Sequence, residues 1–324
     1  MLNLQNTITI FDRITEINSE KEYWFIRTDG NDYADFIEKG FIGIHWNFIA
    51  ASDIREDHLA DLRTAVILNY DKFRPVPFHE LDPGEKSAVS KIIRKLFTFI
   101  DMKKGDIVLI QSENSDHFSI GEIDDEKIYH ATTEDLSSCK YIKRRKVNWL
   151  KKSIRHQSHD ALFYSLKHAH QSIISVKKHA DLIDSLTEEL YLKNGDCFLS
   201  LKINKETEIN LKDLRDLFDN YLELISRINT DFDFGEKIDA TTVKLNLNSP
   251  GLISIKLPAG KSLIVTSVML SMFLSGCSDE EISLKINRDS VPVEYITYMD
   301  SIQTIRKNLE VEKDTIFNRL MTEP

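Results

Sequence analysis

The sequence has few cysteines and no recognisable catalytic motif. Its three cysteines, Cys139, Cys197 and Cys277, are widely spaced and odd in number, so they frame neither a disulfide scaffold nor a cysteine-based metal site. No segment matches a Walker loop, a dinucleotide-binding glycine fingerprint, a nucleophile elbow or an HExxH helix. We therefore expect a binding protein rather than an enzyme, with no catalytic residues, no cofactor and no metal.

The sequence also lacks a signal peptide and an apolar run of membrane length. The first residues, MLNLQNTITIFDRITEINSEKE, have neither a basic region nor an apolar region, which predicts a cytoplasmic protein. The uncharged stretch Ser262–Gly276 is shorter than the ~20 apolar residues that cross a bilayer. It predicts a buried helix and no stable membrane span, with a membrane-active segment as the alternative.

Acidic residues outnumber basic ones overall, but the charge is unevenly distributed. The formal net charge is -10, in a chain that is 41% hydrophobic and 29% charged, as in an ordinary globular protein. Residues 139–180 hold eleven Lys and Arg against one acid, a local net charge of +10 that leaves -20 for the rest. Such asymmetry indicates a polyanionic partner, and a merely solvated basic face is the alternative.

Short strand patterns separated by turns fill the first half of the chain. Tyr23–Ile26 and Phe41–Trp46 are rich in aromatic and β-branched residues, and a short helix that Gly40 ends lies between them. Asp82-Pro83-Gly84-Glu85 predicts the start of a longer helix. Further strands are expected near Ile107–Ile110, Ser119–Ile123 and Arg145–Leu150. Many short strands with glycine at tight passages predict a small curved sheet or open barrel with flanking helices.

These strands carry a resemblance to a known superfamily. The opening strand WFIR, the turn KGD before IVLI, the strand SIGEI and the basic strand ending VNWL resemble the PUA-like superfamily and, within it, EVE-like domains. The resemblance covers Tyr23 to Leu150 and extends to amino-terminal domains of prokaryotic restriction and phage-defence proteins. It implies a barrel-like sheet whose pocket accepts a flipped or modified base, or a related nucleotide.

Carried over to this sequence, the resemblance implies a set of ligand-binding residues. At the position where EVE-like domains often have an aromatic residue, this chain has Gln111-Ser112. Stacking in such a pocket contributes about 1–3 kcal/mol per base. For each tryptophan taken singly, core packing is the favoured role, because strand aromatics usually fill cores. The expected ligand-binding residues are Trp24, Arg27, Trp46, Asn47, Gln111 and Ser112.

A basic segment follows the last expected strand. We expect its side chains to contact a nucleic-acid backbone, with DNA as the preferred partner. The serine-rich, basic surroundings of Cys139 are of a kind that lowers the pKa of a thiol, but without a paired base at a readable spacing a plain, unreactive cysteine is the preferred interpretation. The expected backbone contacts are Lys143, Arg144, Arg145, Lys146, Lys151, Lys152 and Arg155.

The second half of the chain predicts a separate α+β domain. Cys197–Ile203 has a strand pattern, and Leu211–Ile228 an amphipathic helix with Asn210 as its cap. Thr241–Leu257 predicts a hairpin, and Tyr295–Met321 a charged final helix. The nearest fragments of a nuclease metal site are weak, since no apolar strand surrounds them; they are Asp231, Asp233, Glu236 and Lys237.

These patterns together predict an α+β protein in three parts. Residues 1–152 form the PUA/EVE-like base-binding domain, 153–192 a basic helical connector, and 193–324 a domain for oligomerisation or partner docking. The expected function is a sensor of a modified or flipped base, or of a nucleotide, in prokaryotic anti-phage defence. The alternative is a defence effector whose carboxy-terminal half acts on a membrane or as a hydrolase after nucleotide sensing.

Overall fold

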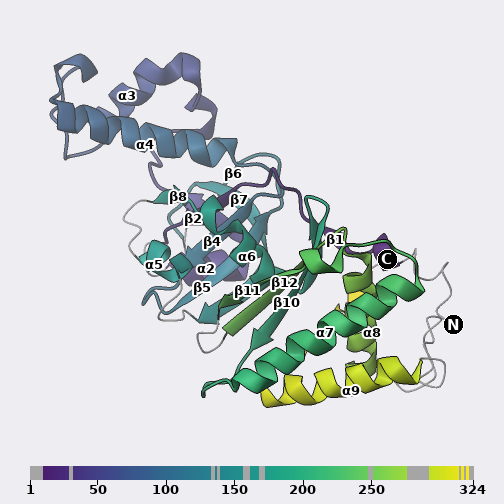
Figure 1. Ribbon diagram of the computed structural model, residues 1–324. Helices are drawn as coiled ribbons and strands as arrows, with labels where there is room; N and C mark the ends of the chain where they lie inside the picture. Colours follow the sequence, from purple (N-terminus) through teal and green to yellow (C-terminus); the bar gives the residue numbers. More distant parts are fainter. Residues whose placement is uncertain are drawn as a thin grey trace. The chain divides into compact units, whose positions relative to one another are not determined.

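The computed structural model divides the chain into two compact units (Figure 1). The central unit comprises residues 20–181, and the terminal unit comprises residues 1–19 and 182–324. This division differs from the predicted one, because residues 1–19 join the carboxy-terminal half and residues 153–181 join the amino-terminal part. The structure describes residues 10–28, 32–132, 136, 139–155, 161–167, 172–246, 251–275, 292–313, 315–316 and 319–320.

The central unit is built on a curled, half-barrel sheet (Figure 1). Its strand order is β3-β7-β5-β4-β2-β8, and β6 pairs with β7 beside this path. β2 and β4 run parallel, whereas β5 pairs antiparallel with both β4 and β7. The strands are β2 (Tyr23–Ile26), β3 (Phe41–Ile44), β4 (Ile107–Gln111), β5 (His117–Ile123), β6 (Tyr129–His130), β7 (Lys143–Arg155) and β8 (Ile173–Ser175).

Three helices of the central unit bury apolar side chains in the same core cluster as the sheet. α4 begins as its sequence predicts, because Asp82 accepts a hydrogen bond from the Glu85 amide (2.9 Å) while Glu85 accepts one from the Asp82 amide (3.1 Å). Its buried residues, among them Val89 and Leu96, belong to the same apolar cluster as Phe41 of β3. The helices are α2 (Asp32–Lys39), α3 (Leu59–Leu68) and α4 (Pro83–Asp101), with 3-10 turns at Ala51–Asp53, Glu56–His58 and Phe78–Glu80.

The predicted helical connector over residues 153–192 is helical only in part, and strands interrupt it. β7 continues to Arg155, and β8 adds a strand to the sheet by pairing antiparallel with β2. Ile173 and Ile174 suit an extended strand, and β2 offers them a free edge. The other elements here are α5 (Ala161–Lys167), a 3-10 turn (Lys177–His179), α6 (Ala180–Thr187), which crosses the boundary between the units, and β9 (Leu190–Lys193).

The terminal unit has its own sheet, with the strand order β1-β9-β10-β12-β11. The predicted hairpin is confirmed, since β11 and β12 pair antiparallel; its turn at 247–250 lies outside the described residues. Figure 1 shows α7, α8 and α9 beside this sheet. The elements are β1 (Thr15–Glu16), β10 (Asp196–Ile203), α7 (Leu211–Asp231), a 3-10 turn (Ile238–Ala240), β11 (Thr242–Asn246), β12 (Gly251–Pro258), α8 (Lys261–Ser275) and α9 (Val293–Asn308).

The uncharged stretch near residue 262 forms α8, which is buried in the core of the terminal unit. Leu263 is fully buried, and Val268 and Leu270 are nearly so. Thr266 and Ser267 donate their hydroxyl hydrogens to carbonyls four residues earlier, at 2.7 Å each, so the helix satisfies its own polar side chains. The prediction of a buried helix is confirmed. Across the described residues, no helix combines the length and apolar character that a membrane crossing requires.

The predicted α+β fold class is confirmed for both units, with corrections in detail. α9 ends at Asn308, whereas the predicted helix ran to Met321, and the segment after α9 forms a bridge from Val311 to Ile203 of β10. Asn210 caps α7 as predicted, accepting a hydrogen bond from the Lys212 amide at 2.9 Å.

Candidate functional site

Three consecutive cations at the start of β7 are buried. Lys143 is 0% exposed, and Arg144 and Arg145 are 1% exposed. The first four residues of β7 pair with β3, and the same strand then pairs with β5, so this part of the sheet is internal. Neither a Lys nor an Arg is buried in this way unless its hydrogen-bond donors find acceptors.

Backbone carbonyls supply most of these acceptors. The Lys143 ammonium donates to the carbonyls of Trp46 (2.7 Å) and Ile49 (2.9 Å), and burial lowers the pKa of Lys143 to about 8. Arg144 donates to the carbonyls of Tyr141 and Cys139, at 2.9 and 3.1 Å. Its guanidinium carbon also lies 4.1 Å from the centroid of the Phe41 ring, a cation–π contact.

Arg145 ties the sheet to the end of α4. It donates to the carbonyls of Phe99 (3.0 Å) and Ile100 (2.6 Å) and to Asp125 (3.0 Å). Lys143, Arg144 and Arg145 therefore have structural partners and cannot reach a phosphate. This corrects the prediction that all seven basic residues contact a nucleic-acid backbone. Lys146, Lys152 and Arg155 are exposed and Lys151 is half-buried, so these four remain accessible.

The two tryptophans do not frame a common opening in the way the sequence predicts. Trp46 is 8% exposed and belongs to the buried core cluster, so it packs rather than stacks on a ligand. Trp24 is half-buried near the start of β2, where its indole N–H donates to Asp106 at 3.3 Å. Three strands separate β2 from β3 in the sheet order. Core packing, the role favoured for each tryptophan taken singly, describes Trp46.

Asn47 has a structural role in the described structure. Its amide donates to the Lys140 carbonyl (2.7 Å) and accepts from the Ile142 amide (3.3 Å). These bonds hold the segment before β7 against the end of β3.

The strand register gathers several of the remaining predicted residues at one end of the sheet. Ile26 pairs with Ile110, so the residues that follow them, Arg27 and Gln111, lie side by side. Gln111 pairs with Phe118 of β5. The residue before Phe118, His117, pairs with Arg155 of β7. We call this row the rim, and it consists of Arg27, Gln111, Ser112, His117 and Arg155.

Within the rim, the polar side chains have hydrogen-bond partners in the protein, whereas the two arginine side chains have none among the described residues. Arg27 and Arg155 are both exposed. Ser112 donates to Asp116 (2.8 Å) and accepts from the His117 amide (3.1 Å), so it shapes the turn. Gln111 is 8% exposed, and its carbonyl accepts from Thr28 at 2.7 Å. The two arginines are therefore the groups available to a ligand.

An aromatic residue that the sequence interpretation did not select lies next to the rim. Tyr33 of α2 is half-buried, and its hydroxyl lies 2.7 Å from the Ser119 hydroxyl. Ser119 pairs with Ile110, one position before Gln111, and its hydroxyl accepts from the Ser153 amide at 3.2 Å. Its place depends on α2 folding back to the sheet, for which the sequence around Tyr33 has no local signal.

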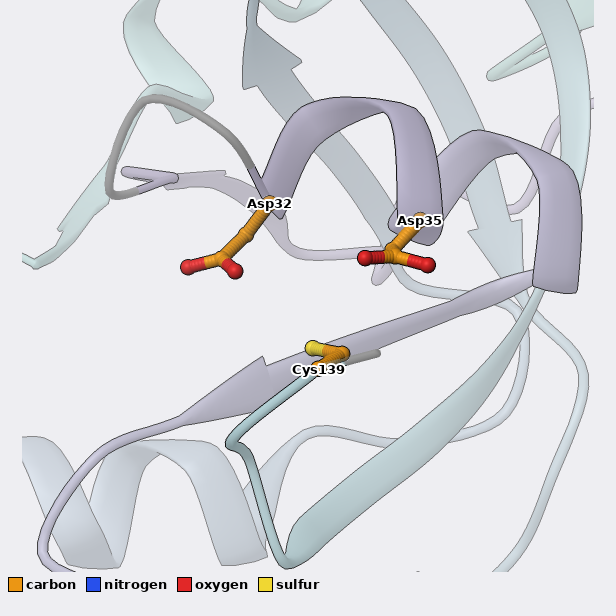
Figure 2. A group of neighbouring side chains, drawn as sticks. All are labelled: Asp32, Asp35 and Cys139. Carbon is orange, nitrogen blue, oxygen red and sulfur yellow. The ribbon is translucent and has the colours of Figure 1, made fainter. Parts of the chain in front are cut away.

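A second group that the sequence interpretation missed lies at the start of α2. Figure 2 shows Asp32 and Asp35 on one side of this helix with Cys139 opposite them. One potential ligand atom from each residue lies within 4.8 Å of the other two. The spacing of the two aspartates is readable as one helical turn. Cys139 is 107 residues from Asp32 along the chain, so no local pattern connects it to them.

The surroundings of Cys139 are not those expected for a reactive cysteine. Burial, as the largest cause, raises the pKa of its thiol, and the nearby Arg144 only opposes this rise. This agrees with the plain cysteine that the sequence favoured, because the residue is 1% exposed and the Arg144 guanidinium donates to backbone carbonyls.

The weak nuclease fragments of the second half also have structural partners. Glu236 accepts from the backbone amides of Lys261 (2.5 Å) and Ser262 (3.0 Å), which caps α8. Asp231 accepts a hydrogen bond from the Tyr295 hydroxyl. These carboxylates are thus engaged in holding helices.

One known protein family matches part of this chain. Residues 24–177 match a family described as a domain of unknown function, DUF8426, which covers just under half of the chain and lies within the central unit. The comparisons with curated proteins and with solved structures found no match.

Proposed function

We propose that the central unit is a PUA-like module, related to EVE-like domains, that binds a modified or flipped base of DNA or a nucleotide. The observation that carries this proposal is the pair of exposed arginines, Arg27 and Arg155, at the same end of a curled sheet. Exposed guanidinium groups suit phosphate oxygens, which they contact with two parallel hydrogen bonds. A prokaryotic anti-phage role in the cytoplasm is part of this proposal.

The remaining exposed cations extend the proposed path of the backbone. Lys146 and Lys152 lie on β7, the strand that ends at Arg155. The strand advances about 3.3 Å per residue, so these cations extend the basic surface from the rim along β7, where a phosphate backbone can contact them. Tyr33 supplies an aromatic ring near the rim for a base, in place of Trp46.

The experiment is fluorescence anisotropy of labelled single-stranded and duplex DNA with the full chain, over a range of salt concentrations. In the double variant Arg27→Ala/Arg155→Ala, we expect weaker binding and a salt slope reduced by about 2, one for each lost phosphate contact. Lys91→Ala removes an exposed cation from α4 and is the matched control, with binding unchanged. Equal binding by the double variant and the wild-type protein would contradict the proposal.

Stacking is tested separately at Tyr33. Tyr33→Leu removes the aromatic face, and we expect a loss of about 1–3 kcal/mol in binding free energy if a base stacks there. Tyr33→Phe keeps the face and removes only the hydroxyl contact with Ser119. A similar loss in both variants would mean that the hydroxyl contact matters and that no base stacks on the ring.

The second half of the chain is proposed to mediate oligomerisation or docking of a partner. The alternative, an effector half that acts on a membrane, was based on the apolar segment Ser262–Gly276. That segment begins in α8, whose described side chains through Ser271 are buried except for Lys261. Because these side chains are buried in the protein, they do not support action on a membrane, and we favour the binding module.

A further inference from the structure

The group at the start of α2 combines three potential metal ligands from two distant segments. Asp32 and Asp35 lie one turn apart on α2, and Cys139 lies in the segment that leads into β7. Figure 2 shows both carboxylates extending from the helix toward the side where the Cys139 sulfur lies. The three ligand atoms are mutually within 4.8 Å.

Asp32 supplies an independent indication of a ligand. The residue is 8% exposed, and its Oδ2 atom has no hydrogen-bond partner among the described residues. The Lys140 ammonium forms an ion pair with this oxygen at 3.8 Å, a separation too long for a hydrogen bond. A buried carboxylate oxygen without a donor is costly, and a bound cation removes that cost.

We infer that Asp32, Asp35 and Cys139 bind a Zn²⁺ ion. Zinc accepts thiolate and carboxylate ligands together, with bonds of about 2.3 Å to sulfur and about 2.0–2.2 Å to oxygen. Tetrahedral ligands at these bond lengths are roughly 3.3–3.7 Å apart. The three atoms lie within 4.8 Å of one another, so the inference requires side-chain rotations that shorten these separations by about 1 Å. The thiol proton leaves to solvent as the sulfur binds, and water takes the fourth position.

Lys39 occupies one oxygen of Asp35 and leaves the other for the ion. The Lys39 ammonium lies 2.8 Å from Oδ1 of that carboxylate. Zinc bound here would fasten α2 to the segment before β7, which Asn47 holds from the other side through the Lys140 carbonyl. This inference does not depend on base binding.

The experiment is a titration of the chelator-treated full chain with Zn²⁺ alone, followed by calorimetry. We expect one ion per chain, with an affinity that falls by more than about 100-fold in Cys139→Ser and in Asp35→Asn, since even outer-shell changes cost 10–100-fold. A parallel titration with Co²⁺ is expected to give a thiolate-to-metal absorption band that Cys139→Ser abolishes. No stoichiometric binding, or binding unchanged in both variants, overturns the inference, as does Co²⁺ bound without this band.

Two controls separate a lost ligand from a lost fold. Asp61→Asn changes an exposed acid of the same unit, and Cys197→Ser changes a buried cysteine of the terminal unit. Both are expected to keep wild-type zinc affinity. Asp35 is half-buried, so Asp35→Asn is expected to fold, and its tryptophan fluorescence checks this. DNA binding by the Arg27→Ala/Arg155→Ala variant tests the proposed function separately.

Discussion

The central and terminal units satisfy their buried polar side chains in different ways. In α8 of the terminal unit, Thr266 and Ser267 donate to carbonyls of the same helix. In the central unit, the Lys143 ammonium donates to carbonyls 97 and 94 residues away in the chain. Polar groups are thus satisfied locally in α8 and across the fold in β7.

This difference shows what the buried cations of the central unit do. The carbonyls they reach, at Trp46, Ile49 and Ile100, lie at or beyond the ends of strands and helices. Carbonyls in such places lie outside the regular hydrogen-bond ladders and need donors when buried, and the Trp46 carbonyl accepts from the Ile49 amide at 3.0 Å as well as from Lys143. A long basic side chain can reach them from a neighbouring strand. The cations of β7 therefore stabilise irregular backbone around the curled sheet.

The largest expected loss of stability follows from removing one of these buried cations, Arg145. Arg145→Ala removes the donor to Oδ1 of Asp125 and to the carbonyls of Phe99 and Ile100, and we expect a loss of about 3–5 kcal/mol in the free energy of unfolding. Urea unfolding followed by tryptophan fluorescence measures it, because all three tryptophans lie in the central unit. The control Lys146→Ala, at an exposed position, should change this free energy by less than about 0.5 kcal/mol. Equal effects of the two variants would refute a special role for the buried cation.

The corresponding change in the terminal unit creates a cavity in its apolar core. Leu263→Ala removes a fully buried side chain of α8 and should cost about 2–5 kcal/mol. Leu211→Ala, at a leucine that is 78% exposed at the start of α7, should have almost no effect. Amide hydrogen exchange of peptides from α8 and β10 measures the change in stability. Unchanged protection in Leu263→Ala would mean that α8 does not contribute to the core.

The next effect is a pH dependence specific to the central unit. The pKa of Lys143 is about 8 in the folded protein, below the ~10.4 of an unfolded lysine, so the unfolded state binds more protons between these values. Stability must therefore rise with pH through this window, and from pH 7 to 9.5 Lys143 contributes a gain of about 2 kcal/mol.

Lys143→Met is the variant that isolates this gain. It removes the ammonium that bonds the Trp46 and Ile49 carbonyls, so it is less stable at every pH, but it should lack the rise. The control Lys146→Met should retain the wild-type profile. Tryptophan fluorescence in urea at both pH values gives the comparison. A parallel pH profile for wild-type protein and Lys143→Met would show that the ammonium titrates outside this range.

Local signals in the sequence predicted much of the fold. The capping box at Asp82 and Glu85, the hairpin of β11 and β12, and the uncharged stretch of α8 each specify their structure within a few residues. The three-residue β8 was missed because its strand character depends on an open edge of β2, from a segment almost 150 residues earlier. A run of Lys and Arg likewise looks exposed until its acceptors are known.

The candidate site was predictable only in part for the same reason. Arg27 and Gln111 were selected through the resemblance, and the register of β2 and β4 does bring them together. Trp46 was selected for its flat ring, but the ring fills the core. The grouping of Cys139 with the aspartates of α2 depends on a tertiary contact, so periodicity could not find it.

The smallest expected effect compares one helix cap in each unit. Asp82 caps α4 through a reciprocal pair of bonds with Glu85, whereas Asn210 caps α7 through a single bond to the Lys212 amide. Each change to alanine should cost about 1 kcal/mol, within a range of about 0.5–2. We expect the larger cost at Asp82, because its loss also frees Glu85 from the box. Fluorescence reports on Asp82→Ala, and hydrogen exchange in α7 reports on Asn210→Ala. A larger cost at Asn210 would mean that the number of capping bonds does not decide the effect. The packing of α7 on α9 would then make the start of α7 more sensitive to its cap than the start of α4 is.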